Sequence, residues 1–209
     1  TEGNLVDAVA SSHTISEDHK TYTFTLREGV KFHNGADVSV DDVKYSIERC
    51  ADTSEGEPLV SAFSAISEVN TPDEKTVEIV LKEADTEFLA YLTTAVVPKD
   101  SEDLDTQPVG TGPFMFVSRI PQENIIVEKF EDYWDGPAKL DQVTFKVLKD
   151  SNAILTSLKG GSVDMCFHLN STQVAELEDD FRIFEGNMNL VQALYLNNQE
   201  EPLNDVKVR

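Results

Sequence analysis

KTYTFTLREGVKFHNGADVSVDDVKYSIER, from Lys20 to Arg49, is the stretch that decides the fold of this sequence. It begins with the alternation of a half-buried strand, whose apolar face carries Tyr22, Phe24 and Leu26. Gly29 and Asn34-Gly35 stand where the chain must reverse, because glycine and asparagine tolerate the backbone angles of tight turns. The pattern predicts a strand, a glycine turn, a short second strand and a second glycine turn.

A capped helix follows the second turn. Ser39 is a favourable N-cap residue, and Asp42, three positions later, completes a capping-box-like pair. Asp41 adds negative charge near the positive end of the helix dipole. The apolar stripe of this helix consists of Val40, Val43 and Ile47, with Tyr45 on its flank. The stretch contains no arrangement typical of a nucleophile or a metal site, so we interpret it as scaffold.

The sequence from residue 1 to about 107 forms the first predicted unit. A hairpin is its clearest further feature, because the turn Thr71–Glu74 separates a strand-like run from the alternating segment Thr76–Leu81. The other elements expected here are a short helix over 58–66, a strand over 66–69, a helix over 85–93, an extended run over 96–98 and a charged loop over 99–107.

The second predicted unit starts at Pro108. Its expected elements are paired strands over 114–118 and 124–129, a strand over 142–148, a helix over 150–159, a strand over 163–167, a helix over about 171–177 and a strand over 190–196. Gly160-Gly161 ends the first of these helices, and Ser171 caps the second. Strands interleave with short helices, so the predicted fold class is mixed α/β.

Four motifs together resemble the extracytoplasmic solute-binding proteins of ABC transporters, and more narrowly their peptide/nickel-binding family. The first is FTLREGVKFHNG, followed after a short gap by DDVKYSIER, within Lys20–Arg49. The others are PVGTGPFMF at Pro108–Phe116, Tyr133-Trp134 followed by LDQVTF, and the terminal LNDVKVR at Leu203–Arg209. All four occur in the order of the family and at roughly its spacings, and together they cover most of the sequence.

The resemblance implies a two-lobed, periplasmic-binding-protein-like fold of type II. By this resemblance, residues 1–107 correspond to a small extra domain of the peptide-binding members, and residues 108–209 correspond to part of the first lobe. Family members extend beyond the matched segments at both ends, so we expect the sequence to be a fragment that lacks the second lobe. The sheet of the second unit is then incomplete, and its open edge would favour self-association.

The resemblance also implies a function. The expected role is the solute-binding component of an ABC importer, which binds an oligopeptide or a related small solute between two lobes and delivers it to a membrane permease. The expected location is extracytoplasmic, in the periplasm or as a cell-surface lipoprotein. Two alternatives stay open: a peptide-sensing receptor module, and a hydrolase that uses paired carboxylates. Peptide, nickel chelate and sugar all remain open as the solute.

Composition supports a globular, acidic protein. The 209 residues are 40% hydrophobic, and the formal net charge is -22. This charge argues against a nucleic-acid partner, because binding to phosphates needs a basic face. Cys50 and Cys166 lack C-x-x-C spacing, so two separate thiols are favoured over a disulfide.

Residues near the solute cleft are expected at two places. By resemblance, Phe88 and Tyr91 belong to an apolar region near the cleft, although packing of Phe88 in the core is equally compatible with the sequence. Gly110, Thr111 and Gly112 form a turn near the same cleft, in which two glycines permit positive φ and Pro113 fixes the exit. Trp134 is expected to pack structurally rather than stack on a solute.

Catalytic and metal chemistry is not predicted. None of the four histidines forms an H-x-x-x-H pair, so no metal or other cofactor is expected. Asp41-Asp42 lies at a helix start, where carboxylates stabilise the backbone dipole without any catalytic role. Gly110-Thr111-Gly112 is followed directly by proline, which prevents the helix start that a phosphate-binding loop requires. We therefore predict a binding protein and not an enzyme.

Overall fold

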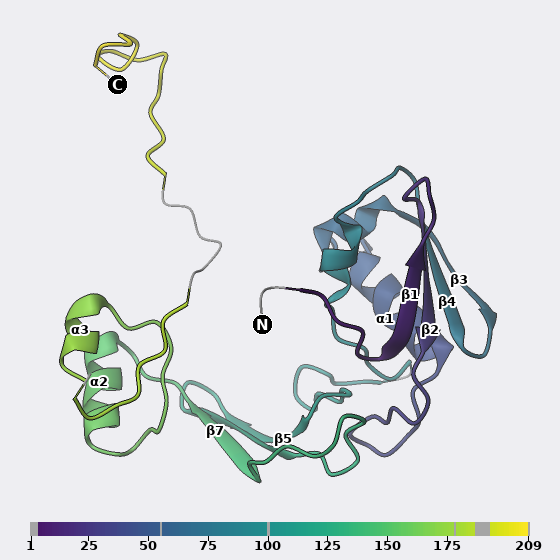
Figure 1. Ribbon diagram of the computed structural model, residues 1–209, viewed down its shortest axis with the longest axis horizontal. Coiled ribbons are helices and arrows are strands. Elements are labelled where there is room, and N and C mark those ends of the chain that lie inside the picture. The colour runs from purple at the N-terminus through teal and green to yellow at the C-terminus, as the bar shows by residue number, and fades with distance from the viewer. Residues whose placement is uncertain (1–3, 55, 100, 178, 187–192, 209) are drawn as a thin grey trace. The chain divides into compact units, whose positions relative to one another are not determined.

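The computed structural model describes residues 4–54, 56–99, 101–177, 179–186 and 193–208 (Figure 1). The chain divides into two compact units, Thr1–Val147 and Leu148–Arg209. The boundary predicted at residue 108 falls inside the first of these units, between its two sheets. The assignment of residues 1–107 to a small extra domain and of residues 108–209 to part of the first lobe stays a prediction.

A four-stranded antiparallel sheet organises the first part of unit 1. Its strand order is β1-β2-β4-β3, and the strands are β1 (Ala10–Ile15), β2 (Thr21–Leu26), β3 (Ile66–Asp73) and β4 (Thr76–Leu81). The central pair β2 and β4 is in register at Tyr22 and Ile79. Strand β1 was not predicted, because its sequence ASSHTI lacks apolar alternation. It forms as an edge strand through its pairing with β2.

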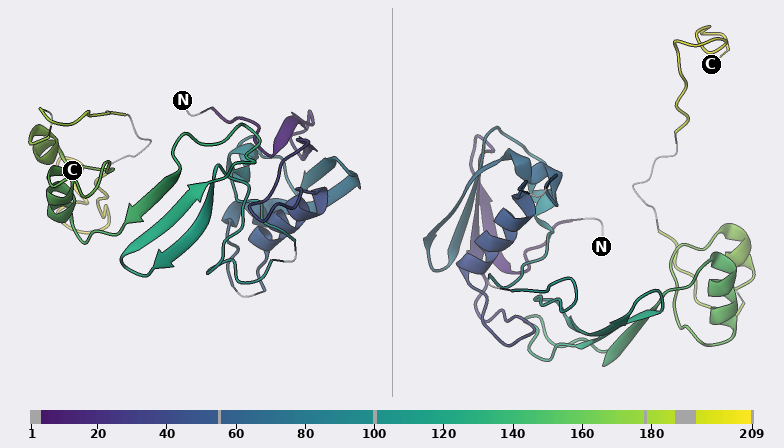
Figure 2. Two further views of the ribbon diagram at one scale, coloured as in Figure 1. Left: turned by 90° about the horizontal axis from the view of Figure 1, so that it is seen from below. Right: turned by 180° about the vertical axis from the view of Figure 1, so that it is seen from behind.

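The core of unit 1 lies between this sheet and helix α1 (Val40–Ala51), which packs against β3 and β4 (Figures 1 and 2). Its fully buried members include Tyr22, Phe63, Val77, Ile79 and Phe88. The alternation in β2 and β4 places Tyr22, Val77 and Ile79 on one face, as predicted for β2. Ile47 is buried and Val40 and Val43 pack against the core, which confirms the predicted stripe of α1.

The start of α1 confirms the predicted capping box. The Ser39 hydroxyl accepts from the Asp42 N–H at 3.3 Å, and an Asp42 carboxylate oxygen accepts from the Ser39 N–H at 2.8 Å. These two bonds satisfy backbone N–H groups that have no partner within the helix.

The two glycine turns ahead of α1 are also confirmed. Gly29 has φ +76° and Gly35 has φ +86°, a region that favours glycine. The predicted short second strand is reduced to a single bridge between Lys31 and Asp37. Around it the Phe32 N–H donates to the Ala36 carbonyl and the Val38 N–H to the Val30 carbonyl, so the segment is a tight hairpin without a regular ladder.

Two predicted helices are shorter than expected. The segment 58–66 forms the 3₁₀ helix η1 (Ser61–Ala65), and the segment 85–93 forms η2 (Phe88–Leu92). Single turns of this kind are too short to gain from cooperative α-helix formation, so the packing of one large side chain in each decides their geometry. Strand β3 is longer than predicted and includes Pro72, which is tolerated because β3 is an edge strand.

The second part of unit 1 is a three-stranded antiparallel sheet of order β5-β6-β7 (Figure 2). Its strands are β5 (Phe114–Ile120), β6 (Asn124–Lys129) and β7 (Gln142–Lys146), which confirms the three predicted strands and the predicted pairing of the first two. Its side chains are mostly half-buried or exposed, and Phe145 is 53% exposed.

Unit 2 contains the helices α2 (Ser151–Lys159) and α3 (Ser171–Ala175). Asp150 caps α2, which ends at Gly160 as predicted. The predicted cap of α3 was wrong: Asn170 is the N-cap and forms a capping box with Gln173, so Ser171 is already the first helical residue.

The strand predicted over 163–167 is absent, and the part of the predicted strand 190–196 that lies within the described residues, 193–196, is not a strand either. Both runs have strand-like composition, but strands need hydrogen-bonded neighbours, and neither run pairs with another described segment. Residues 190–192 lie outside the described part of the chain. No helix in the described ranges is long and apolar enough to cross a membrane.

Ser46 gives a test of how α1 is held to the segment that follows η2. Its hydroxyl is buried, donates to the Asp42 carbonyl at 2.7 Å, and accepts from the Val97 N–H at 2.9 Å. Ser46→Ala leaves that N–H buried without its acceptor, so we expect the free energy of unfolding to fall by about 1–3 kcal/mol. Urea denaturation followed by Trp134 fluorescence measures this change.

The matched control is Ser64→Ala, because the Ser64 hydroxyl is exposed and donates to the Ser61 carbonyl. A loss no larger for Ser46→Ala than for this control would contradict the role assigned to Ser46.

Candidate functional site

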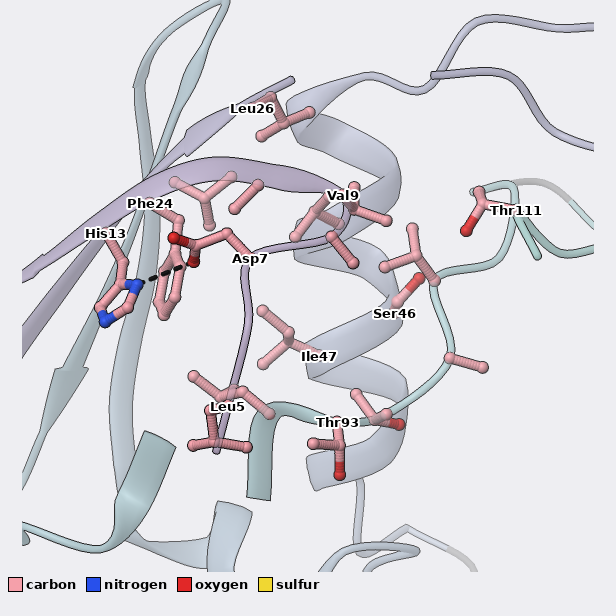
Figure 3. A pocket seen from close by; sticks show the side chains of 18 of the residues that line it. Leu5, Asp7, Val9, His13, Phe24, Leu26, Ser46, Ile47, Thr93 and Thr111 are labelled. Carbon is pink, nitrogen blue, oxygen red and sulfur yellow. Dashed lines mark hydrogen bonds and ion pairs between the residues drawn. The ribbon is translucent and has the colours of Figure 1, made fainter. Parts of the chain in front are cut away.

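An apolar pocket of about 540 Å³ lies in unit 1 between the four-stranded sheet and α1 (Figure 3). The sheet contributes Phe24, Leu26, Val77 and Ile79, and α1 contributes Val43, Ser46 and Ile47. The remaining walls are the N-terminal segment 5–10, Leu89 and Leu92 of η2, residues 93–96 after it, and the turn 110–112. Concave, mostly apolar sites with a few polar groups are typical of small-molecule binding, so this apolar pocket is the candidate site.

The predicted turn Gly110–Gly112 lines the apolar pocket, and His33 holds it in place. The Gly110 N–H donates to His33 Nδ1 at 3.3 Å, and His33 Nε2 lies 3.0 Å from the Gly112 carbonyl oxygen. The His33 backbone N–H also donates to the Gly110 carbonyl at 2.9 Å. These bonds leave the backbone N–H and C=O of Thr111 without a hydrogen-bond partner among the described residues.

The explanation predicted for the two glycines of this turn was wrong. Neither Gly110 nor Gly112 has a positive φ. A Cβ atom on Gly110 would lie 3.7 Å from the His33 ring, an ordinary contact distance, and one on Gly112 would meet no heavy atom within 4 Å. The fold of unit 1 therefore does not require glycine at either position, and open space is left beside Gly112.

Phe88 and Tyr91 are both placed outside the lining of the apolar pocket. Phe88 is fully buried in the core, with its ring centroid 5.4 Å from that of Tyr22 and 5.8 Å from that of Phe63. Tyr91 is 42% exposed and packs edge-on against Phe88. Their neighbours Leu89 and Leu92 line the pocket instead.

The sequence did not reveal the main polar feature of the apolar pocket. His13 Nδ1 and a carboxylate oxygen of Asp7 lie 2.8 Å apart, and both side chains line the pocket beside Phe24 (Figure 3). The two residues bracket the irregular start of β1, where the register with β2 shifts between Ala10 and Ser12. No spacing rule connects residues six apart across such an irregularity, so no sequence signal pointed to this pair.

Arg27 fastens the N-terminal wall of the apolar pocket to β2. Its guanidinium donates to the Ala8 carbonyl at 2.8 Å and to the Asp7 and Ala10 carbonyls at 3.3 Å each. The same group lies 4.1 Å from the ring centroid of Trp134, a distance typical of a cation–π contact. Trp134 therefore packs structurally, as predicted.

Four carboxyl groups of unit 1 have pKa values that hydrogen bonds shift downward. The pKa values of Asp18, Glu28, Asp52 and Asp73 are lowered, chiefly by hydrogen bonds from Ser16, Lys75, Ser54 and the Lys75 backbone respectively. A general acid needs a raised carboxyl pKa, which is the opposite shift. Within the described ranges, no group of histidine, cysteine and carboxylate side chains could hold a metal ion.

The cysteines are separate thiols, as favoured from the sequence. Both are free: Cys50 is buried beside Thr94, with Sγ and Oγ1 3.4 Å apart, and Cys166 is half-buried. Burial raises the pKa of the Cys166 thiol, which keeps it in the less reactive protonated form.

Comparison with known proteins shows where this fold has been seen before. A family model described as "Bacterial extracellular solute-binding proteins, family 5 Middle" matches residues 4–209. The glutathione-binding protein GsiB of Escherichia coli O1:K1 / APEC is 30% identical over 219 residues, which cover 100% of this chain and 43% of GsiB. Heme-binding protein A of Haemophilus influenzae is 30% identical over 238 residues, covering 99% of this chain and 44% of that protein.

Solved structures agree with the sequence comparison. The binding protein MoaA of A. tumefaciens R10, in complex with mannopinic acid, superposes with a TM-score of 0.76 at 27% identity, covering 96% of this chain and 43% of MoaA. The oligopeptide-binding protein AppA of Bacillus subtilis, in complex with a nonapeptide, gives 0.68 at 29% identity, covering 75% and 34%. The predicted mixed α/β fold of the type II binding proteins is confirmed. The chain spans less than half the length of the curated relatives it matches.

A substitution of Arg27 tests how the N-terminal wall of the apolar pocket is held in place. Arg27→Gln removes a charged donor from three carbonyls of the N-terminal segment, so we expect amides in residues 4–15 to exchange about tenfold faster, since hydrogen bonds to charged groups contribute about 1.5–3 kcal/mol. Hydrogen–deuterium exchange with mass spectrometry measures the rate, and Trp134 fluorescence reports the lost cation. Arg119→Gln, at an exposed position of β5, is the control. Equal exchange in the two variants would contradict the assignment.

Proposed function

The chain belongs to family 5 of the bacterial extracellular solute-binding proteins, and we propose that the whole protein binds an oligopeptide or a related small solute for an ABC importer. The observation that carries this proposal is the family match over residues 4–209, which includes all the elements described above. The family resemblance recognised in the four sequence motifs is thereby confirmed.

The choice of a peptide as solute rests on relatives and on local chemistry. The relatives bind glutathione, heme, mannopinic acid and a nonapeptide, so family membership alone does not select one class. Thr111 offers a backbone N–H and C=O that no described residue uses, beside an apolar pocket. An extended peptide recognises such a pair through its own backbone, while apolar side chains enter the pocket. This combination supports a peptide.

The proposed solute contacts are therefore Gly110, Thr111 and Gly112. Phe88 and Tyr91, the other residues predicted near the cleft, stay a prediction as solute contacts. Since Phe88 is fully buried, its contribution in this geometry is to support η2, whose residues Leu89 and Leu92 face the apolar pocket.

The proposed mechanism is closure of two lobes around the solute by hinge motion, followed by presentation of the closed form to a membrane permease. Closure buries most of the surface of the solute and excludes water from its hydrogen bonds, which raises affinity. The family description is extracellular, and anchoring as a lipoprotein is part of the proposal. The runner-up role, peptide sensing, uses the same binding step. Permease and ATPase genes beside the gene for this protein would favour import.

One prediction concerns which parts of the whole protein contact the solute. The chain spans 43% of GsiB, so we expect the 209-residue chain to bind peptide much more weakly than the whole protein, because solute contacts from the other lobe are missing. Mass spectrometry on the whole protein identifies the retained solute, and calorimetric titration compares the two polypeptides. Equal affinities would show that the described residues contain the complete site.

Another prediction concerns the turn Gly110–Gly112. Gly112→Ala adds a methyl group that meets no protein atom within 4 Å, so the fold tolerates it. If the turn contacts the solute, this methyl group occupies solute space, and we expect the affinity of the whole protein to fall by roughly tenfold. Calorimetry measures the affinity, and unchanged thermal unfolding verifies the fold.

Gly186→Ala is the matched control, because a Cβ atom there also meets nothing within 4 Å and its φ is not positive. If Gly112→Ala binds as well as this control, the turn does not contact the solute.

A further inference from the structure

His33 makes side-chain hydrogen bonds only to backbone groups whose roles are fixed, as far as the described residues show. The Gly110 N–H can only donate, so His33 Nδ1 must accept from it. The Gly112 carbonyl can only accept, so His33 Nε2 must carry a hydrogen. Together these partners select one form of the imidazole, the neutral ring with its hydrogen on Nε2.

A third contact, with the ring of Phe130, also fixes the position of the His33 imidazole. Its centroid lies 5.1 Å from that of Phe130, with the rings nearly perpendicular at 73°. Phe130 is buried, and its backbone N–H donates to the Pro113 carbonyl at 2.9 Å. His33 and Phe130 thus bracket the four residues Gly110–Pro113, so a rotation of the imidazole away from the turn would cost contacts on both sides.

Protonation is incompatible with this arrangement. A charged imidazole carries hydrogens on both nitrogens, so Nδ1 would face the Gly110 N–H with a hydrogen of its own. The charged residues next to His33 and Phe130 in the sequence are in ion pairs: Lys31 with Asp37 at 4.0 Å, and Lys129 with Glu131 and Asp141 at 2.9 Å each. The segment 107–113 has no charged side chain, and none of the described ion pairs includes His33.

We propose that His33 is the positioning residue of the turn Gly110–Gly112 and holds it only as the neutral Nε2–H tautomer. Protonation of the ring releases the Gly110 N–H and loosens the turn. The consequence for binding, a weaker solute site in acid, rests on the proposed function, since it needs the turn to contact the solute. The effect on the turn itself does not.

The test uses the whole protein without solute, labelled with ¹⁵N in histidine and glycine. At neutral pH we expect Nδ1 of His33 to give the NMR signal of an unprotonated nitrogen and Nε2 that of a protonated one, with a coupling network that identifies the tautomer. His33→Gln assigns these signals by their disappearance, and His13→Gln assigns those of the other histidine at the apolar pocket. The Nδ1–H tautomer, or a mixture of the two, overturns the proposal.

A pH series provides the second measurement. As the ring signals of His33 move to the charged form, we expect the Gly110 amide signal to move with the same midpoint. Its hydrogen exchange, corrected for the intrinsic effect of pH, should rise by about 2- to 10-fold, which corresponds to one hydrogen bond. A Gly110 amide that does not follow His33 overturns the proposal.

In His33→Gln the Gly110 amide should lose this midpoint. In His168→Gln, which replaces an exposed histidine of unit 2, it should keep the midpoint. Because no solute is present, these outcomes do not depend on whether the turn contacts one. Weak binding in Gly112→Ala tests that separately.

Discussion

Backbone groups that lie outside the sheets need other hydrogen-bond partners, and in unit 1 two side chains of one short stretch bond to several of them. Arg27, directly after β2, donates to three carbonyls of the segment 7–10. His33, in the hairpin that follows, bonds to both glycines of the turn 110–112. Two walls of the apolar pocket that lack regular structure, the segment 7–10 and the turn 110–112, are therefore held by residues that β2 and the glycine turns position.

This dependence explains why a stretch without catalytic groups has so distinctive a sequence. Gly29 and Gly35 bend the chain on either side of His33, whose ring bonds to the Gly110 N–H. The capping box at Ser39 then starts α1 at a defined residue, and α1 forms the opposite wall of the apolar pocket. The glycine turns and the capping box each fix the direction of the element that follows, and together these elements form the apolar pocket.

The sequence was sufficient to predict those elements whose structure depends on interactions between residues close together in the chain. The alternation of β2, the box at Ser39, the β3–β4 hairpin and the end of α2 at Gly160 all depend on residues within a few positions of each other. It was insufficient to predict features that depend on a partner far away in the sequence. Strand β1 exists because β2 lies beside it, and His33 and Gly112 are 79 positions apart. The family resemblance supplied the location of the turn, but not the histidine that holds it or the Asp7–His13 pair.

The two sheets of unit 1 differ in whether a further strand can pair with their edges. Both outer strands of the first sheet are irregular, since β1 shifts register after Ala10, and β3 shifts twice and contains Pro72. A further strand finds no continuous row of free donors and acceptors on either side. In the second sheet β5 is interrupted between Phe116 and Ser118, whereas β7 pairs with β6 without interruption and exposes Phe145. Any polypeptide that extends unit 1 by strand addition, whether from the same molecule or from a neighbouring one, is thereby directed to the outer edge of β7.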